Sequence, residues 1–280
     1  MPPSNNSTSG LPRRLVAQIA IVALALVFLA WRCWPDGKLR VIFLETKGDA
    51  VLIQTPSGDF MLIDGGGDPA ALAAALGRNM PFWHRTLAAV VLTSADNTHL
   101  PGQVAALERY HADVALAPAT RKHGPMIKEW RTLLGEQQTS IRIASPGERL
   151  RLGEATLRVL AAGDGDASGV LLRLDYGATS VVFDHSAGAA EEAALASASP
   201  RPVDLLAFPW ERDPHTPMMT ALRPRALVLT DGQQADRPAE QTFVERTIGG
   251  AQLYHERLDG TITWVSDGTR AWVETERPRR

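Results

Sequence analysis

A polar turn from Thr93 to His99 holds the residues of this sequence that are best suited to chemistry. It follows the apolar run Ala88 to Leu92, which predicts a buried strand, and it precedes Pro101, which is typical of a helix start. Side chains at the carboxyl end of such a strand point into a shared crevice in an α/β layer. The turn supplies two hydroxyls, one carboxylate and one imidazole: Ser94, Thr98, Asp96 and His99. This set is typical of a metal or catalytic loop that lacks some of its ligands.

Composition restricts what the turn can do. The chain has a single cysteine, Cys33, which excludes an intramolecular disulfide and a thiolate zinc cluster, so a metal site needs His, Asp and Glu ligands. Ser94 and His99 could in principle form a hydrolase dyad, but no GxSxG elbow surrounds the serine. The formal charge of -2 and the pI near 6.4 carry no electrostatic signal for nucleic-acid binding.

Three β segments and a glycine-rich turn must position the polar turn from the amino-terminal side. The segments are 39–45, 50–54 and 60–63, and Asp64-Gly65-Gly66-Gly67 ends the last of them. Asp68 and Pro69 predict the N-cap and first residue of a helix over 70–77. A glycine-rich turn can cradle phosphate, but this one lacks the GxGxxG and GxxxxGK spacings, which favours a tight turn that requires positive φ.

Hairpins and helices alternate through the rest of the chain and occur twice in similar order. We expect strands over 88–92, 114–117, 141–144, 155–160, 170–174, 180–183, 203–208, 226–229, 261–265 and 270–274. We expect helices over 102–110, 120–134, 189–196, 216–222 and 240–248. Two β-rich halves with helices outside predict an α+β fold, an αββα sandwich.

The amino-terminal segment predicts a membrane anchor. Residues 1–14 have the composition of a disordered tail, and LVAQIAIVALALVFLAW (15–31) is apolar except for Gln18. Extended to Trp34, the run is about 30 Å long as a helix, enough to cross a bilayer. The alternative is a cleaved signal peptide, but the run is long and ends without a small-x-small cleavage pattern.

The remaining boundaries follow from the anchor. We expect a linker over 35–40, one globular domain over 41–275 and a basic tail over 276–280. Basic residues flank both ends of the anchor, so their count does not fix its orientation. We expect a single-pass protein of the cell membrane with its globular domain on the extracytoplasmic side.

Five phrases carry a likeness to a known fold. They are VIFLETKGDAVLIQTPSGDFMLIDGGGDP, AAVVLTSADNTHLPG, GVLLRLDYGATSVVFDHS, DLLAFPW and LRPRALVLTDG. Together they resemble the metallo-β-lactamase fold, and most closely the C-terminal domain of ComEC, the competence protein of DNA uptake. The likeness runs from about Val41 to Glu274.

The resemblance implies a degenerate metal site. The family's loop reads HxHxDH, or HxDxDH in ComEC-like domains, and its ligand positions fall on Ser94, Asp96, Thr98 and His99. The first two positions serve one metal and the last two the other, so Asp96 and His99 each survive from a different site. The strand-end aspartate that braces this loop corresponds to Asp64.

Later elements of the family's site are altered too. The bridging aspartate of the TGD phrase falls on Ser186, within Asp184-His185-Ser186. The HHGS phrase becomes Trp210-Glu211-Arg212-Asp213, where Trp210 could fill a former ligand pocket, and the late histidine becomes Arg237. The loop 46–49 is shorter than the family's by about one residue.

Two dispersed ligands would hold an ion weakly, because a catalytic metal needs about three protein ligands and an open position. We therefore expect a catalytically degenerate binding or scaffold module without a cofactor, anchored through 15–34 and partnered by a membrane-complex protein. The alternative is a phosphodiesterase-like or nuclease-like hydrolase. Its mononuclear zinc or manganese site would use Asp96, His99 and Asp184, with one of His185, Glu211 or His215.

Overall fold

The computed structural model describes residue 18 and residues 36–121, 123–163, 169–198, 200–210, 216–230 and 247–277. The expected tail over 1–14 and, except for Gln18, the expected anchor over 15–34 lie outside these residues, as do 278–280. Across the part of the chain that is described, no helix is both long enough and apolar enough to cross a membrane.

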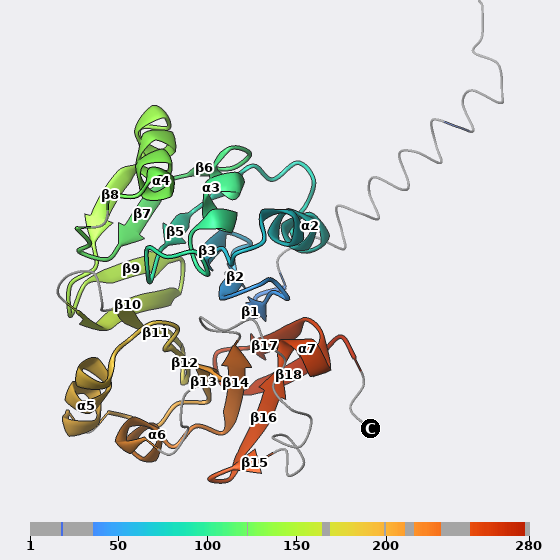
Figure 1. Ribbon diagram of the computed structural model, residues 1–280. Helices are drawn as coiled ribbons and strands as arrows, with labels where there is room; N and C mark the ends of the chain where they lie inside the picture. Colours follow the sequence, from blue (N-terminus) through green and yellow to red (C-terminus); the bar gives the residue numbers. More distant parts are fainter. Residues whose placement is uncertain are drawn as a thin grey trace, which may run out of the picture. The chain divides into compact units, whose positions relative to one another are not determined.

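Within the described residues, two eight-stranded sheets and a small two-stranded ladder form the framework (Figure 1). The first sheet has the order β18-β17-β1-β2-β3-β5-β7-β8. Its strands are β1 (Leu39–Phe43), β2 (Ala50–Gln54), β3 (Phe60–Asp64), β5 (Ala89–Val91), β7 (Val114–Ala117), β8 (Ser140–Ile143), β17 (Ile262–Ser266) and β18 (Ala271–Thr275). The ladder pairs β4 (Thr86–Leu87) with β6 (His111–Ala112).

The second sheet has the order β15-β16-β14-β13-β12-β11-β10-β9. Its strands are β9 (Arg149–Leu152), β10 (Ala155–Ala162), β11 (Val170–Tyr176), β12 (Thr179–Phe183), β13 (Leu205–Pro209), β14 (Ala226–Thr230), β15 (Thr247–Ile248) and β16 (Ala251–His255). The strands β12, β13, β14 and β16 run parallel to one another, so their carboxyl ends meet at one edge of the sheet.

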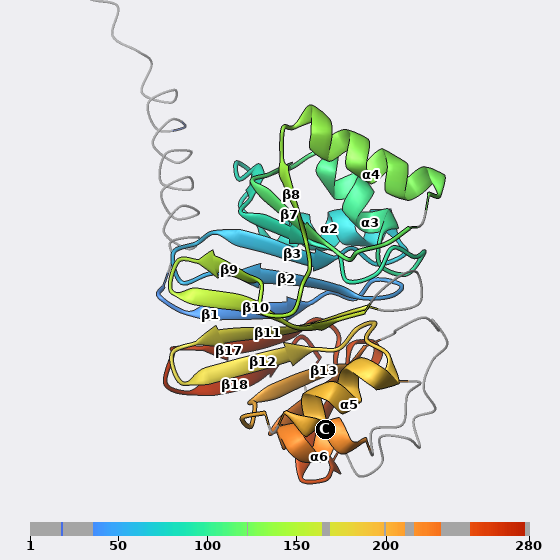
Figure 2. The ribbon, with the colours of Figure 1, turned by 90° about the vertical axis from the view of Figure 1, so that its left-hand side faces the viewer.

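Helices cover the outer face of each sheet (Figure 2). The first sheet carries α2 (Pro69–Asn79), α3 (Pro101–Leu107) and α4 (Pro125–Glu136). The second carries α5 (Ala189–Ser197) and α6 (Pro217–Leu222), and the single turn α7 (Glu256–Asp259) follows β16. Helix, sheet, sheet and helix layers thus make the expected αββα sandwich.

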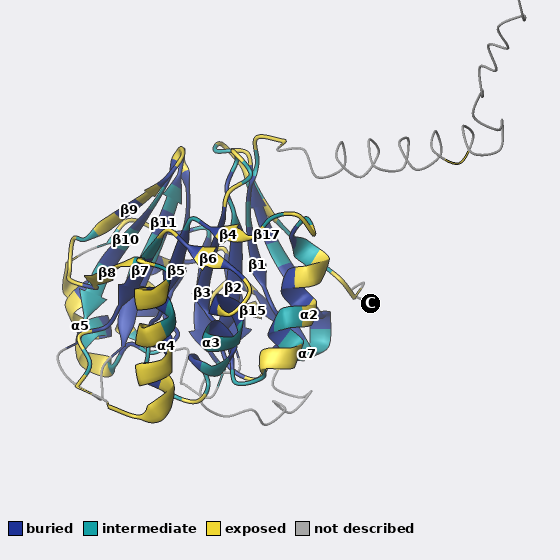
Figure 3. Cartoon of the chain, turned by 90° about the horizontal axis from the view of Figure 1, so that it is seen from above, coloured by how far each residue is buried: buried dark blue, intermediate teal, exposed yellow. Residues whose placement is uncertain are grey.

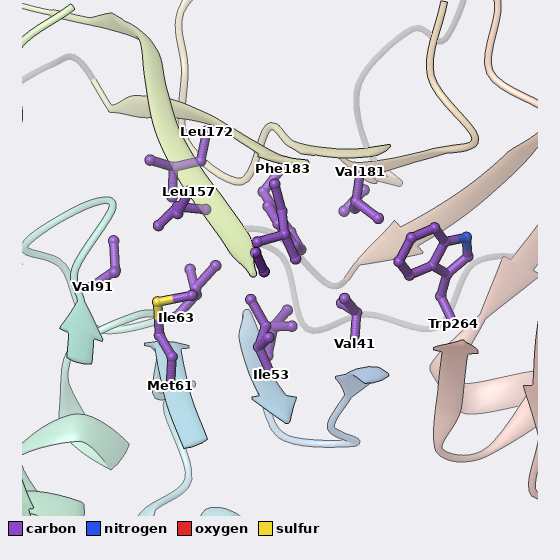
Figure 4. Close-up of a cluster of buried hydrophobic side chains, with 14 of the residues drawn as sticks. Val41, Ile53, Met61, Ile63, Val91, Leu157, Leu172, Val181, Phe183 and Trp264 are labelled. Atoms are coloured by element: carbon purple, nitrogen blue, oxygen red, sulfur yellow. The ribbon is translucent and has the colours of Figure 1, made fainter. Parts of the chain in front are cut away.

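Successive side chains of a strand point to opposite faces of its sheet, so each strand contributes to two separate hydrophobic cores. Val41 and Phe43 of β1 point into the core between the sheets, whereas Ile42 of the same strand joins the core under α2 and α3. Figure 4 shows the central cluster, in which side chains of both sheets meet, and the Phe43 and Phe183 ring centroids are 6.3 Å apart. Figure 3 shows the resulting buried strands with exposed helix faces around them. The sandwich is therefore held together mainly by apolar burial.

The two ends of the sandwich differ. At the site end lie the last residue of β3, Asp64, and the turn after β5, because β3 and β5 run in parallel. At the entry end β1 begins at Leu39, which pairs with Ser266. Since β1 and β3 both pair antiparallel with β2, they run in the same direction, and the start of β3 also lies at the entry end.

Several expected elements need correction. The strands β9 and β16 were not predicted, and the helix expected over 120–134 begins only at Pro125. Of the helix expected over 240–248, residues 240–246 lie outside the described residues, and Thr247 and Ile248 form strand β15. Gly249 and Gly250, with φ of 57° and 88°, make the tight turn that returns the chain into β16.

Candidate functional site

The candidate site lies at the site end, where several strands terminate. Asp64 ends β3, and the turn containing Asp96 and His99 follows β5. From the second sheet, Asp184 and His185 follow β12 and Thr230 ends β14. A crevice between the carboxyl ends of strands is the usual location for chemistry in such folds.

Asp64 holds the turn after β5 in place. Its Oδ1 accepts a hydrogen bond from the Thr93 N–H at 2.7 Å, and its Oδ2 accepts one from the Thr93 hydroxyl at 2.7 Å. The same Oδ2 lies 2.9 Å from Nδ1 of His185, which comes from the other sheet. Asp64 thus braces the loop and also links the two sheets.

The glycine-rich turn after Asp64 is closed to phosphate. Gly65 donates its N–H to the carbonyl of His99 at 2.7 Å, and Gly66 donates to the carbonyl of Asp49 at 2.8 Å. The N–H of Gly67 donates to the carbonyl of Lys47. Of these three glycines only Gly66 has a positive φ, 68°, while a Cβ on Gly65 would lie 2.1 Å from the Gln103 nitrogen. Close packing, together with one left-handed residue, explains the three glycines.

His99 is held by a carboxylate on each ring nitrogen. Its Nδ1 lies 2.6 Å from Oδ1 of Asp96, and its Nε2 lies 3.1 Å from Oδ2 of Asp49. The side chains of His99 and Asp49 are fully buried. Because a carboxylate accepts hydrogen bonds, both imidazole nitrogens act as donors, and the ring is the imidazolium cation. Such a ring has no lone pair to offer a metal ion.

Asp96 is held by donors of its own turn. Its Oδ1 accepts from the N–H of Thr98 at 2.9 Å and from the Thr98 hydroxyl at 2.8 Å, in addition to His99. Its Oδ2 accepts from the hydroxyl of Ser94 at 2.8 Å. Both carboxylate oxygens are thus engaged, Oδ1 by three donors and Oδ2 by one. Ser94 and Thr98 stand at two of the positions that the resemblance assigns to metal ligands. Here their hydroxyls donate hydrogen bonds to Asp96, which stands at a third such position.

The electrostatics follow from these contacts. Burial alone would lower the pKa of His99, but the charge of Asp64 and the hydrogen bonds with Asp49 and Asp96 raise it well above 6.5. Burial would raise the pKa of Asp49, yet the nearby His185 and the bond with His99 bring it below its usual value. The hydrogen bond from His99 likewise outweighs burial and lowers the pKa of Asp96.

His185 joins the same network. Burial opposes its protonation, but the charge of Asp49 and the hydrogen bond with Asp64 raise its pKa above 6.5. Among the described residues, His185 Nε2, Asp49 Oδ1 and Thr230 Oγ1 are buried without a hydrogen-bond partner within 3.5 Å. Thr230 is still close enough to help lower the pKa of Asp49. These polar atoms lie in the buried part of the site.

The structure describes all three residues that were expected to bind metal: Asp96, His99 and Asp184. The structure joins Asp96 to His99 directly, as partners of each other. Asp184 is fully buried at the end of β12, where its N–H donates to the carbonyl of Ala207 at 2.9 Å. In the described ranges, no group of three His, Cys, Asp or Glu side chains is arranged to hold a metal ion. The described residues alone therefore do not assemble a metal centre.

Of the residues at the altered HHGS and late-histidine positions, only Trp210 lies within the described residues. It is half-buried and packs on the core cluster beneath α5 and α6, and its backbone N–H donates to the carbonyl of Thr230 at 2.9 Å. Glu211, Arg212, Asp213, His215 and Arg237 lie outside the described residues. Sequence reasoning missed Asp49, noted only as part of a shortened loop. The sequence feature that could have identified Asp49 is its position directly before a buried strand, at the end of the loop 46–49.

Comparison with solved structures identifies the fold. The metallo-beta-lactamase fold protein YhfI from Bacillus subtilis is 16% identical, covers 85% of this chain and 100% of its own, and gives a TM-score of 0.53. Zn(2+)-bound PqqB from Methylobacterium extorquens is 11% identical, with coverage of 78% and 97% and a TM-score of 0.50. A variant of the CmlA beta-hydroxylase is 12% identical, with coverage of 88% and 59% and a TM-score of 0.51.

At these identities the likeness shows the fold alone, and the chain has the metallo-β-lactamase fold. No protein-family model matches the chain, and no curated protein matches its sequence.

Proposed function

We propose that this chain is a membrane-anchored, ComEC-like protein of the metallo-β-lactamase fold that has lost metallohydrolase activity and acts as a binding or scaffold module. Residues 15–34 would form the single-pass anchor in the cell membrane, with the domain on the extracytoplasmic side beside a protein of a membrane complex. One observation supports the loss of activity: both ring nitrogens of His99 are hydrogen bonded to carboxylates, the buried Asp49 and the partly buried Asp96.

The chemistry of the loop supports this proposal. Zinc binds a neutral imidazole through a nitrogen lone pair, and the imidazolium of His99 has none. The cation instead neutralises carboxylates that a metal would otherwise neutralise. Recruiting His99 as a ligand would require its proton to leave and both carboxylate hydrogen bonds to break, at the cost of a buried ion-pair network.

Metal content of the purified full chain tests the proposal. We expect less than one equivalent of zinc or manganese per chain after incubation with either ion and gel filtration. One equivalent of bound metal that is lost in both Asp96→Ala and His99→Ala would contradict the proposal. Asp113→Ala, which removes a carboxylate exposed on the surface, is the matched control.

A metal-dependent hydrolase with a mononuclear site is the second candidate, and one observation favours it. Asp49 Oδ1 and His185 Nε2 are buried without hydrogen-bond partners among the described residues, and such atoms usually have one. In this candidate Asp96, His99 and Asp184, with one of His185, Glu211 or His215, would hold zinc or manganese, and the ion would activate a water for phosphodiester cleavage. Stoichiometric metal together with metal-dependent cleavage of a generic phosphodiester substrate would establish it.

A further inference from the structure

We infer that the entry end of the domain is a membrane-contacting surface that lies in the headgroup region of the same phospholipid bilayer that holds the anchor. This inference rests on the anchor in the proposed function and adds which face of the domain meets the lipid. Three features of the structure carry it: a short tether, exposed aromatic side chains and neighbouring cations.

The tether between anchor and domain is short because its last residues are fixed to the domain. The carboxylate of Asp36 makes two bonds with the Arg40 guanidinium, at 2.8 and 2.6 Å. The carbonyl of Gly37 accepts a hydrogen bond from the Tyr176 hydroxyl at 3.1 Å. Only Pro35 separates Asp36 from Trp34, the end of the apolar run, so the two Cα atoms are at most about 7.6 Å apart. With residues 15–34 in the bilayer, as the proposed function has it, this short tether would keep the entry end close to the lipid.

Aromatic side chains are exposed at this end. Phe82 is 68% exposed and Trp83 is 49% exposed, and their rings contact each other edge to face. Their loop lies beside the start of β3, because the next residue, His84, stacks on Phe60 with ring centroids 4.9 Å apart. Exposed Trp and Phe side chains are costly in water, but they are favoured at the headgroup level of a bilayer.

A third aromatic residue lies farther along the same end. Trp272 of β18 is 37% exposed and pairs with Val265, which pairs in turn with Arg40 at the start of β1. Three strands, β17, β1 and β2, separate β18 from β3. At about 4.8 Å between neighbouring strands, β18 and β3 are roughly 19 Å apart, and the two aromatic groups lie beside these two strands. Two such contacts on either side of the tether would fix the tilt of the domain.

Cations accompany both aromatic groups. The ammonium of Lys38 lies 5.5 Å from the centre of the Trp272 ring, and the guanidinium of Arg85 lies 5.7 Å from the Tyr110 ring. The Lys38 ammonium also lies 3.7 Å from the carboxylate of Asp36. In the inferred orientation both cations would contact lipid phosphates while their carbon stems cover apolar surface. The nearby Asp36 carboxylate is neutralised by Arg40, whose hydrogen bonds lower its pKa to about 2.

The candidate site lies at the end of the domain away from the lipid. Asp64 and His99 are one strand length from the entry end, and strands of five residues are about 17 Å long. In the inferred orientation the site end therefore faces the aqueous phase.

Single-cysteine labelling of the full chain tests the inference. Cys33→Ser removes the only native thiol, and exposed positions then receive one cysteine each: Trp83→Cys and Thr269→Cys at the entry end, with Asn97→Cys and Lys128→Cys as matched controls away from it. Each variant carries a bimane fluorophore and is reconstituted into vesicles of phosphatidylcholine and phosphatidylglycerol with brominated acyl chains.

Labels that lie about 5–10 Å inside the headgroup boundary should lose most of their fluorescence to the brominated lipid. We expect this loss at positions 83 and 269 and unchanged fluorescence at 97 and 128. Equal quenching at all four positions, or quenching confined to 97 and 128, would overturn the inference while leaving the anchor intact. Hydrogen exchange of the unmodified chain gives a second readout: residues 81–85 should exchange more slowly in vesicles than in detergent.

Flotation after carbonate extraction separates the two proposals. A chain that floats with the vesicles has its anchor, and the quenching pattern then decides which face meets the lipid. A chain that stays in the soluble fraction lacks the anchor, and the surface assignment fails with it.

Discussion

His99 supplies the positive charge at the centre of the candidate site. Its imidazolium lies between the carboxylates of Asp49 and Asp96 and close to Asp64, and it supplies the positive charge that these carboxylates need when buried. These contacts hold the loop through the protein's own side chains.

Removing one partner of this buried network should be costly. In Asp49→Ala the His99 imidazolium loses its Nε2 acceptor, and His185 loses a nearby opposite charge. Breaking a buried ion pair on one side costs about 3–5 kcal/mol, so we expect a loss of that size in the free energy of unfolding, measured by urea denaturation of the full chain. Asp113→Ala, at an exposed carboxylate, should stay within about 0.5 kcal/mol of wild type. Equal losses in both variants would show that the network has no special role.

The network also predicts how stability depends on pH. The folded-state pKa values of His99 and His185 are raised, so their contribution is complete below about pH 6.5 and is lost as pH rises through the folded values. The lowered pKa values of Asp49 and Asp96 give a contribution that is present above about pH 4 and is lost on acidification.

We therefore expect the urea midpoint to be highest between about pH 4 and pH 6.5 and to fall steadily toward alkaline pH. His99→Gln should flatten the alkaline decline, because this variant has no proton to lose at that position. An unchanged alkaline slope in His99→Gln would place the titrating groups elsewhere.

The sequence indicated part of this site and missed the rest for a physical reason. Asp64, Asp96 and His99 lie next to predicted strand ends, where local pattern places side chains reliably. Asp49 bonds to a residue 50 positions away, and only the pairing of β2 with β3 and of β3 with β5 brings the two together. Long-range proximity of this kind has no local signature.

At the scale of elements, the position of α3 is limited by close contact between its backbone and the glycine-rich turn after Asp64. A Cβ on Gly102, in α3, would lie 1.8 Å from the carbonyl oxygen of Gly65, whereas a Cβ on Gly77, in α2, would meet nothing within 4 Å. Both glycines are helical, so the two positions form a matched pair.

Alanine substitutions at this pair should have opposite effects. Gly102→Ala forces backbone apart and should destabilise the full chain by about 1–3 kcal/mol or more. Gly77→Ala removes only the entropic disadvantage of a helical glycine and should stabilise by about 0.5–1 kcal/mol. Thermal and urea unfolding of the two variants measure both effects. A stable Gly102→Ala variant would mean that α3 is free to shift away from the glycine-rich turn.

Elements that are set by neighbouring residues could be predicted from the sequence, whereas strands that depend on pairing with distant segments could not. The start of α2 was predicted from Asp68 and Pro69, and the Asp68 carboxylate does cap it by accepting from the N–H groups of Ala70 and Ala71. Strand β9 alternates exposed and buried residues over only four positions, too short a pattern to stand out. Strand β16 forms by pairing with β14, and the local sequence pattern does not predict this contact.

At the scale of the whole molecule, the network joins halves that are distant in sequence. Asp64 belongs to the first sheet and His185 to the second, 121 positions later, and their contact closes one end of the sandwich. The apolar core between the sheets closes the rest of the interface. Because charge and apolar burial act on the same interface, we expect the two sheets to unfold together.

The thermal midpoint of the full chain should therefore not depend on metal. An ion that binds only the native state at a hundred times its Kd adds about 2.7 kcal/mol of stability. For a domain of this size that corresponds to a rise of roughly 5–10 °C in the midpoint. We expect shifts below about 1 °C when zinc, manganese or a chelator is added, because the nitrogens of His99 and the oxygens of Asp96 are already occupied. A zinc-dependent rise that disappears in His99→Gln would show that the imidazolium releases its proton to a metal, and would restore the hydrolase as the better account of this fold.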